Sequence, residues 1–353
     1  MTEPDKAIHP IGWSPEVDWA SVQSGLPHSI VDIYNHQRSS CPVAWRGFAD
    51  GQGFWSVFDY EDVLAVLNDP ATFSSATPKY GMTLIPIEVD PPAHRHYRML
   101  LAQLINPQRL QPIEDDIRLI IRTLIDELVI GKRSLLEVTA EIPIRAFCLL
   151  VGDSDPDNFR RIHAAREAAN DPRLARLDAS SAAQRKAANQ PLVDYCAALL
   201  EAHRRTPRED VVSDILAGQI EGRPITQEEA LSMLSLLYIA GNRTTTAALR
   251  GAVVQLAQAP DIQAALRADS ALLAHAIEEI IRLETPVHGL PRYAMRDTQI
   301  KGCPIKKGEQ VFPNFRNLYA YFWGGCYGGK SAIMGALLGI WALGSLRHYL
   351  RDR

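Results

Sequence analysis

One long helix, predicted over residues 226–258, most constrains how this chain can fold. Thr226-Gln-Glu-Glu229 matches a capping box, and the apolar repeat that follows continues to about Gln258, just before Pro260. At 1.5 Å per residue this helix is about 45 Å long, enough to cross a molecule of this size. Its first half is apolar nearly all round, which predicts that it is buried. The apolar positions there are Ala230, Met233, Leu234, Leu237 and Tyr238.

The middle of the long helix, Ala240-Gly-Asn-Arg-Thr-Thr-Thr246, departs from the good helix formers around it. A glycine such as Gly241 permits the close approach of a flat ligand. A threonine hydroxyl there can bond back to the carbonyl four residues earlier and loosen the helix. The simpler alternative is a tight crossing with another helix, in which every hydroxyl is satisfied. The residues alone leave both interpretations open.

The central part of the chain predicts a mainly α fold. Residues 92–283 show an almost entirely helical pattern, with a clean amphipathic repeat over residues 113–128. The region 155–190 is rich in Arg and Ala and has few large apolar residues. We therefore expect its helices to be exposed and mobile.

Both ends of the chain predict a small β part. The stretch Cys41–Asp59 alternates aromatic and small residues around glycines, which suits a short hairpin. After Pro286 the period changes to that of short strands beginning at Arg292, with turns at Gly302 and Lys307-Gly308. No convincing domain boundary is visible between these parts.

Composition and charge exclude several classes of protein. The 37 Lys and Arg residues against 41 Asp and Glu residues give a net charge of −4, without the basic excess that a nucleic-acid-binding protein shows. The five cysteines are scattered and never form a CxxC pair, which excludes the usual zinc spacings and argues against a secreted disulfide scaffold. The N-terminal segment is polar and acidic, without the pattern of a signal peptide, so we expect a cytoplasmic protein.

The segment Asp90-Pro-Pro-Ala-His-Arg-His-Tyr-Arg98 predicts the start of a helix, with Asp90 as the N-cap and Pro91 as the first helical residue. His94 and Arg98 are then four residues apart and share one face. Both side chains donate hydrogen bonds, so together they can clamp a carboxylate or a phosphate. The alternative is a solvated basic face. His94 and His96 are two apart and point to different faces, so they make a poor metal pair.

Two further segments carry weaker signals. A helix predicted from near Ser270 to just before Pro286 contains Glu279 and Arg282, which are three residues apart and can form a local ion pair. In Leu290-Pro-Arg292 the arginine stands at the start of the first late strand, where its guanidinium can face an anion. By itself, neither segment indicates a particular function.

The order of these segments is more informative than any one of them. A DPP-x-H-x-x-x-R helix start is followed by a long helix with AG-x-x-TT, an E-x-x-R helix, a P-R pair before a strand and a G-x-x-I-x-x-G-E-x-V hairpin. This series resembles the cytochrome P450 family of heme-thiolate monooxygenases, in particular the soluble bacterial members. The resemblance covers about residue 41 to Val311. It implies a mainly α, cytochrome P450-like fold with a small β part, in a single large domain spanning residues 1–317.

The resemblance also implies a heme cofactor and roles for individual residues. His94 and Arg98 would hold the heme propionates, and Arg292 would be a further propionate partner. Gly241 would let the long helix approach the oxygen-binding face of the porphyrin. Thr244 matches the threonine that helps to relay protons to bound oxygen.

The resemblance also implies a structural ion pair, a lid and a type of reaction. Glu279 and Arg282 match the structural E-x-x-R pair, and the region 155–190 would form a mobile lid over the substrate pocket. The family inserts one oxygen atom from O2 into an apolar small molecule. The apolar helix around residues 237–240 fits such a substrate, for example a terpenoid. No flavin or iron–sulfur motif occurs in the chain, so electrons would come from a separate ferredoxin-type donor.

The sequence departs from the family pattern in two places. Arg243 stands where family members usually place an acidic residue before the threonine, which changes the expected proton route. After Val311 the family continues to F-x-x-G-x-[HR]-x-C-x-G, whose cysteine supplies the iron-bound thiolate. Here Cys326-Tyr-Gly328 matches only the end of that motif, and several dozen preceding residues are missing. Cys326 is therefore the candidate iron ligand, with the ligand otherwise unknown.

Residues 318–353 form a divergent apolar tail. Its segment Ser331–Leu346 has 16 apolar or small residues and includes Gly335-x-x-x-Gly339, a pattern of membrane helix pairs, but it is shorter than the roughly 20 residues of a typical span. The tail is a replacement helix, a membrane anchor or the product of a frameshift, and we favour the frameshift. Three functional hypotheses follow: an active monooxygenase, a catalytically inactive relative with the same fold, and a membrane-tethered binding protein.

Overall fold

The computed structural model describes residues 34, 37–47, 53–76, 82–104, 111–153, 155, 157–158, 160–162, 164, 179–269 and 271–315. These residues form two compact units. The sheet unit contains the described residues up to 76 and from 287 onward, and the helical unit contains those from 82 to 286. Because the sheet unit takes residues from both sides of the helical unit, no single cut in the chain separates the two.

The sheet unit is built around a five-stranded sheet with the strand order β1-β2-β9-β6-β3. The predicted early hairpin is confirmed, since β1 and β2 are antiparallel neighbours, and β9 then pairs with β2 in parallel. Both ends of the described chain therefore contribute to the β part, as predicted, and the structure joins them in one sheet. The elements are β1 (Val43–Gly47), β2 (Gly53–Val57), α3 (Tyr60–Asn68), β3 (Phe73–Ser74), β6 (Arg292–Ala294), β7 (Thr298–Ile300), β8 (Cys303–Ile305) and β9 (Gln310–Pro313).

The late strands turn at the two predicted glycines. Gly302 and Gly308 have φ angles of 80° and 87°, a left-handed backbone conformation that glycine adopts without steric cost. Gly302 closes the β7–β8 hairpin, and Gly308 lies in the turn before β9. The apolar core of this unit is formed by Val43, Val57, Val63, Val66, Phe73, Ala294, Ile300, Ile305 and Val311.

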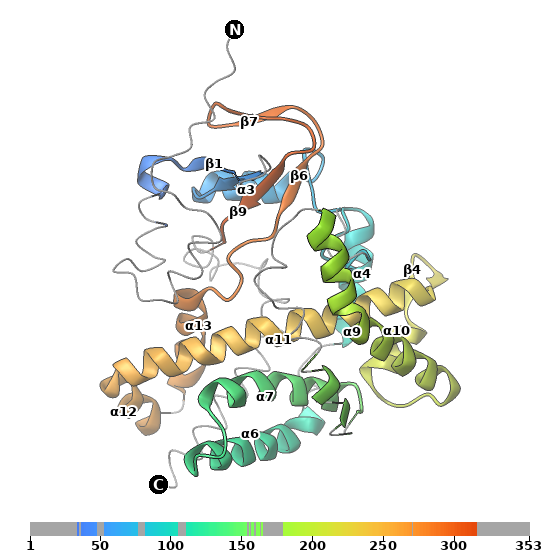
Figure 1. The fold of residues 1–353 in the computed structure, drawn as a ribbon, viewed down its shortest axis with the longest axis vertical. Helices are drawn as coiled ribbons and strands as arrows, with labels where there is room; N and C mark the ends of the chain where they lie inside the picture. The colour runs from blue at the N-terminus through green and yellow to red at the C-terminus, as the bar shows by residue number, and fades with distance from the viewer. Residues whose placement is uncertain are drawn as a thin grey trace. The chain divides into compact units, whose positions relative to one another are not determined.

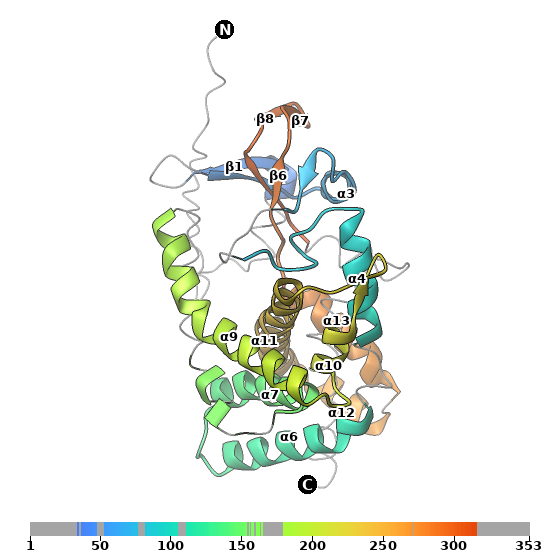
Figure 2. The same cartoon turned by 90° about the vertical axis from the view of Figure 1, so that its right-hand side faces the viewer.

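The helical unit is layered, with α7 lying between α11 and α6 in both ribbon views (Figures 1 and 2). Its longest element is α11, which packs against α7, α9, α10, α12 and α13. The elements are α4 (Ala93–Leu104), the 3-10 helix η1 (Gln111–Ile113), α6 (Glu114–Val129), α7 (Leu135–Leu150), α9 (Ala179–Arg205), α10 (Val211–Ala217), β4 (Gln219–Ile220), β5 (Arg223–Pro224), α11 (Gln227–Gln258), α12 (Pro260–Ala268) and α13 (Leu272–Glu284).

The prediction for the long helix is confirmed at both ends. α11 begins after Thr226, whose side chain accepts from the Glu229 N–H at 3.2 Å in a capping box, and it ends at Gln258. All five apolar positions predicted to be buried in its first half are buried. Ser232 of this half accepts a hydrogen bond of 2.8 Å from the Ile85 N–H, which fixes the segment before α4 to α11.

The start of α4 was predicted too early. The helix begins at Ala93 rather than at Pro91, and its first hydrogen bond runs from the His94 N–H to the Asp90 carbonyl at 3.1 Å. The physical reason is that Pro91 itself precedes a proline, and a residue before proline is disfavoured in the helical region. The β4–β5 hairpin, two short strands joined by Glu221 and Gly222, was not predicted.

Part of the predicted lid lies outside the described residues, including residues 165–178. The described residues at the start of α9, up to 190, are mostly exposed, although Asn189 is buried. The mobility of this region stays a prediction. Within the described part of the chain, no helix combines the length and apolarity that crossing a membrane requires.

Candidate functional site

The Glu229 carboxylate fixes α4 to the N-terminal end of α11. Tyr97 of α4 donates its hydroxyl hydrogen bond to Glu229 Oε1. Arg223 of β5 contacts both carboxylate oxygens, with Nη2 2.6 Å from Oε1 and Nη1 2.9 Å from Oε2. The backbone N–H of Thr226 donates to the same group at 2.7 Å. The Arg223 guanidinium holds the pKa of Glu229 well below its usual range, so this carboxylate is ionised at neutral pH. A single charge therefore links three elements.

His94 and Arg98 share one face of α4, as predicted, and both are half-buried. Because Tyr97 of the same helix is tied to Glu229, the rotation of α4 about its axis is set, and with it the direction of this face. His96 belongs to a different face, where its Nδ1 lies 3.4 Å from Glu221 Oε1. The two histidines therefore lie on different faces of α4, as the sequence predicts.

Gly241 is buried in the middle of α11, but helix packing does not require a glycine there. A Cβ atom at this position would lie 3.6 Å from Phe147 Cδ2, an ordinary contact distance. The tight crossing on this helix is ten residues later, at Gly251, where a Cβ atom would lie 2.2 Å from Glu284 Cγ of α13. The structure thus removes the main argument for Gly241 as a packing glycine. Its role in admitting a flat ligand stays a prediction.

Thr244 lies one turn after Ala240 and is half-buried. Its hydroxyl donates to the Ala240 carbonyl at 2.7 Å, the bond that the sequence predicts for a threonine in this position. Since a hydroxyl also has two acceptor lone pairs, Thr244 Oγ1 remains able to accept a hydrogen bond from a ligand. Arg243, in the position of the family's acidic residue, is exposed.

The predicted ion pair on α13 is present. Arg282 Nε donates to Glu279 Oε2 at 2.7 Å, and the side chains are 35% and 56% exposed, so the isolated pair contributes little to stability. The contact that ties α13 to α11 is instead made by Glu284, whose Oε1 accepts from Gln255 Nε2 at 2.7 Å. Sequence analysis missed this contact, because Glu284 carries no local signal for a partner on another helix.

Arg292 is the first residue of β6 and belongs to the sheet unit, whereas His94 and Arg98 belong to the helical unit. It pairs in register with Val311 of β9, and its Nη1 donates to the Pro291 carbonyl at 3.1 Å. Its position at the start of a strand is therefore as predicted. Its role as a propionate partner stays a prediction.

Two of the described cysteines, Cys148 and Cys196, are poor sources of a thiolate. Cys148 and Cys196 are completely buried in the apolar core of the helical unit. Burial raises the pKa of Cys148 and raises the pKa of Cys196 to about 12, so both thiols stay protonated. Within the described ranges, no group of three His, Cys, Asp or Glu side chains could hold a metal ion. Cys326 and the tail 318–353 lie outside the described residues.

Comparisons of the sequence with a family model and with curated relatives agree on one family. The family model described as "Cytochrome P450" matches residues 170–320. Linalool 8-monooxygenase of Pseudomonas putida is 30% identical over 309 residues, which cover 81% of this chain and 74% of the relative. Cytochrome P450 109 of Bacillus spizizenii is 29% identical over 290 residues, which cover 79% of this chain and 69% of the relative.

The fold agrees with solved structures of the same kind. The crystal structure of the cytochrome P450 enzyme CYP109B1 from Bacillus subtilis has a TM-score of 0.72 with this chain, at 25% identity, and covers 91% of each chain. The predicted mainly α fold with a small β part is therefore confirmed. The chain belongs to the cytochrome P450 family.

The Glu229 contacts predict a defined dependence of stability on pH. Glu229→Gln keeps the capping-box hydrogen bonds but removes the charge that Arg223 and Tyr97 contact. A carboxylate whose folded-state pKa is lowered stabilises the fold above its unfolded pKa, about 4.3, and this stabilisation is lost as pH falls below that value. We expect the variant to melt several degrees lower at pH 7 and the difference to shrink as pH falls from about 4.3 toward 3. Thermal melts between pH 3 and 7 measure this.

The matched control for that measurement is Glu228→Gln, which removes an exposed carboxylate from the same helical turn. It should melt within a degree or so of the parent at every pH. An equal effect of both substitutions would contradict the role given to Glu229.

Alanine substitutions at the two glycines of α11 are expected to have opposite effects on the free energy of unfolding. Gly241→Ala should leave stability unchanged or raise it by up to about 1 kcal/mol, because alanine is the better helix former and the added methyl group fits. Gly251→Ala should lower stability by about 1–3 kcal/mol, because the methyl group overlaps the Glu284 side chain. Urea unfolding of both variants tests this. A similar loss in both would show that Gly241 is also a packing residue.

Proposed function

We propose that the chain is a heme-dependent monooxygenase that inserts one atom of O2 into an apolar small molecule, using electrons from a separate ferredoxin-type protein. The observation that carries the proposal is a buried glycine, Gly241, that helix packing does not require, placed one turn before the half-buried hydroxyl of Thr244 on α11. That pair lies in the unit that also orients His94 and Arg98. Membership of the family supplies the reaction class.

The described residues fit a heme on its carboxylate side. His94 and Arg98 are two half-buried hydrogen-bond donors on one face of a helix whose rotation is fixed, which suits a propionate. Arg292 is proposed as a further propionate partner. When bound, heme with a thiolate ligand supplies the electron density that favours O–O cleavage.

On the other side, the residues of α11 prepare the space in which oxygen and substrate meet. Gly241 leaves open a volume that a side chain would fill. Thr244 has its own proton directed to the Ala240 carbonyl, so its oxygen accepts a hydrogen bond and can hold a proton donor, such as a water molecule, in place. In this proposal Thr244 positions the proton, and Gly241 admits the porphyrin.

The substrate is proposed to be apolar, in the class of the terpenoid alcohols to which linalool belongs. The relative named linalool 8-monooxygenase supports this choice. Leu237 and Tyr238 are buried in the helical core, while Ile239, which also packs against that core, and Ala240 are half-buried. Ile239 and Ala240 are therefore the proposed apolar contacts from this segment.

Spectroscopy of the reduced protein with CO tests the proposal. A Soret band at the position diagnostic of a thiolate ligand is expected, because Cys326 is proposed as the iron ligand. Cys148 and Cys196 are buried thiols with raised pKa values and are not proposed for this role. Cys326→Ser should abolish this band, while Cys148→Ser should leave it in place. Protein without heme, or with heme lacking the thiolate band, would favour the alternative hypothesis of a catalytically inactive relative with the same fold.

A second experiment tests the role of Thr244 in the loaded enzyme. Thr244→Ala removes the hydroxyl and should lower the product formed per electron pair consumed by about 10-fold or more, in the range typical of lost proton transfer. Thr244→Ser restores a hydroxyl and should recover most of the product yield. The CO spectrum should be the same in all three proteins. An unchanged product yield in Thr244→Ala would remove Thr244 from the proposal.

A further inference from the structure

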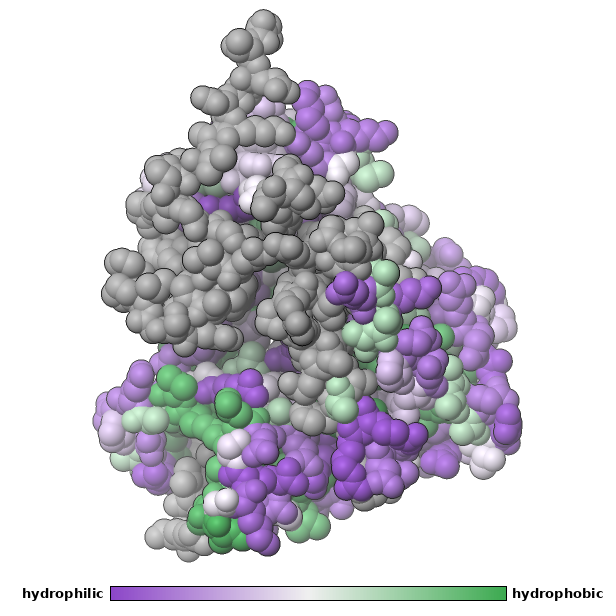
Figure 3. All heavy atoms as spheres, in the orientation of Figure 1, coloured by the Kyte–Doolittle hydropathy of each residue, from purple (hydrophilic) through white to green (hydrophobic). Residues whose placement is uncertain are grey.

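The helical unit exposes a group of large apolar side chains at one end. They lie at the end of α6, in the first turn of α7 and in the last third of α11, and apolar side chains gather in this region at the lower left of Figure 3. We call this group the apolar end surface. It consists of Val129, Ile130, Leu135, Leu136 and Val254.

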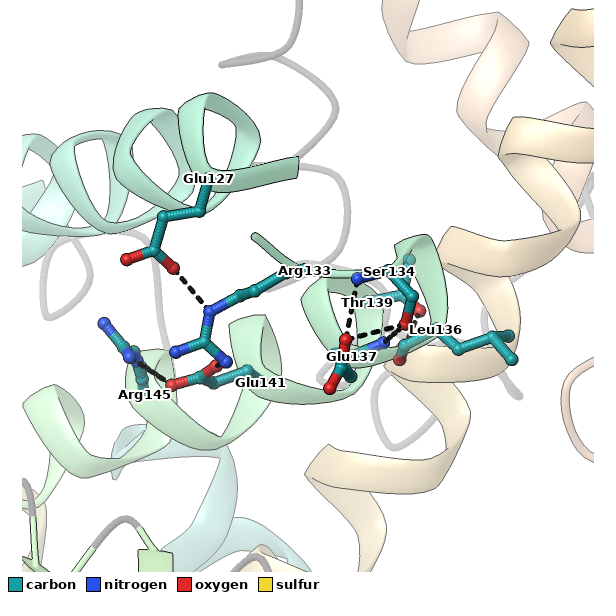
Figure 4. Close-up of polar contacts among 8 residues, drawn as sticks. All are labelled: Glu127, Arg133, Ser134, Leu136, Glu137, Thr139, Glu141 and Arg145. Carbon is teal, nitrogen blue, oxygen red and sulfur yellow. Dashed lines mark hydrogen bonds and ion pairs between the residues drawn. The ribbon is translucent and has the colours of Figure 1, made fainter. Parts of the chain in front are cut away.

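This surface stands on an ordered frame rather than on a frayed helix end. In Figure 4, Arg133 of the α6–α7 turn contacts Glu127 of α6, and its Nη1 lies 2.7 Å from Glu141 Oε2 of α7. The first turn of α7 is closed by a capping box between Ser134 and Glu137. The exposure of the apolar residues between these contacts is therefore a property of the folded unit.

Leu136 shows that the apolar end surface continues the buried apolar contact between α7 and α11, which we call the seam. Residues of α7 at helical spacing from it, Ala140, Pro143 and Phe147, are all buried. Phe147 packs against Tyr238 of α11 with the ring centroids 4.2 Å apart. Leu136 lies on the same stripe of α7, yet it is 60% exposed. The apolar seam thus extends beyond the part that α11 covers.

α11 contacts α7 next to the end of the seam that is exposed to solvent. Arg250 Nη2 donates to the Leu136 carbonyl at 3.0 Å, and its Nε donates to Thr139 at 3.1 Å. Val254 lies one turn further along the same side of α11 and is exposed. The two helices therefore leave apolar side chains uncovered on both sides of their last contact.

The chain contains a segment whose chemistry matches this surface. Residues 331–346 have no charged side chain and consist of apolar and small residues. In water such a segment is driven to bury its apolar area, and it is short for a membrane span. As a helix its 16 residues would be about 24 Å long, comparable with α6 and α7.

Charge is complementary as well. The apolar segment is flanked by Lys330 and Arg347, and Arg351 follows. Next to the apolar end surface, two exposed carboxylates, Asp126 of α6 and Glu137 of α7, outnumber one exposed cation, Lys132 of the α6–α7 turn. Carboxylates at the rim favour pairing with the basic residues at both ends of the segment.

We propose that residues 331–346 of this chain pack against the apolar end surface and complete the seam between α7 and α11. The segment is then an internal part of the helical unit rather than a membrane anchor. This inference does not depend on heme binding or on activity.

Photo-cross-linking in the full-length chain tests the proposal. p-Benzoylphenylalanine in place of Leu136 should cross-link on irradiation to peptides within residues 331–346 of the same chain, as identified by mass spectrometry. The same substitution at Leu119, which is 63% exposed on the outer face of α6, is the matched control and should give no such cross-link. Cross-links from position 136 to a second copy, to added lipid vesicles or to no partner would each overturn the proposal.

Hydrogen exchange provides an independent measurement without a photoreactive residue. In the full-length chain, amides within residues 331–346 should exchange at least about 10-fold more slowly than an unstructured peptide. Leu136→Lys should remove this protection, whereas Leu119→Lys should preserve it. Unprotected amides in the parent protein, or equal protection in both variants, would contradict the proposal.

Discussion

The burial of α11 is the constraint on which the helical unit depends. Each end of α11 is fixed by a carboxylate. At the start, Glu229 of α11 binds Arg223 and Tyr97; near the end, Glu284 of α13 accepts a hydrogen bond from Gln255 of α11. Between these two fixed points residues 232–238 are all buried, and the apolar core forms around them. The position of the helix is therefore set by contacts that are distant from Gly241 and Thr244. In the middle of the helix, Gly241 is a position at which helix packing does not require a glycine.

The contacts at the start of α11 also position residues on a different helix. Because Tyr97 shares α4 with His94 and Arg98, the hydrogen bond to Glu229 fixes the face on which both donors lie. An anion-binding pair on a helix that could rotate would lose much of its specificity, since both donors must address the same group. The capping box of α11 thus stabilises a helix end and, through the same carboxylate, orients the proposed cofactor-binding residues.

The sequence predicted α11 to the residue because its signals are local. A capping box, an apolar repeat and a following proline all act within a few residues of the helix end. The start of α4 was missed by two residues, although the rule against a helical residue before proline was available in Pro91-Pro92. The difference between Gly241 and Gly251 could not have been predicted, because it depends on which side chain of another helix faces each one. For the same reason Glu284 gave no signal, while the weaker pair of Glu279 and Arg282 was found from its spacing.

The position of Arg243 bears on how protons reach the proposed site. α11 contains only two carboxylates, Glu228 and Glu229, and Glu229 is 15 residues before Thr244, a distance of about 22 Å along the helix. Glu229 is also committed to Arg223 and stays ionised. No acid on this helix can therefore pass a proton to Thr244, and Arg243 cannot act as one, because a guanidinium does not release its proton in proteins. If Thr244 orders a proton donor, that donor is water or a group from another element.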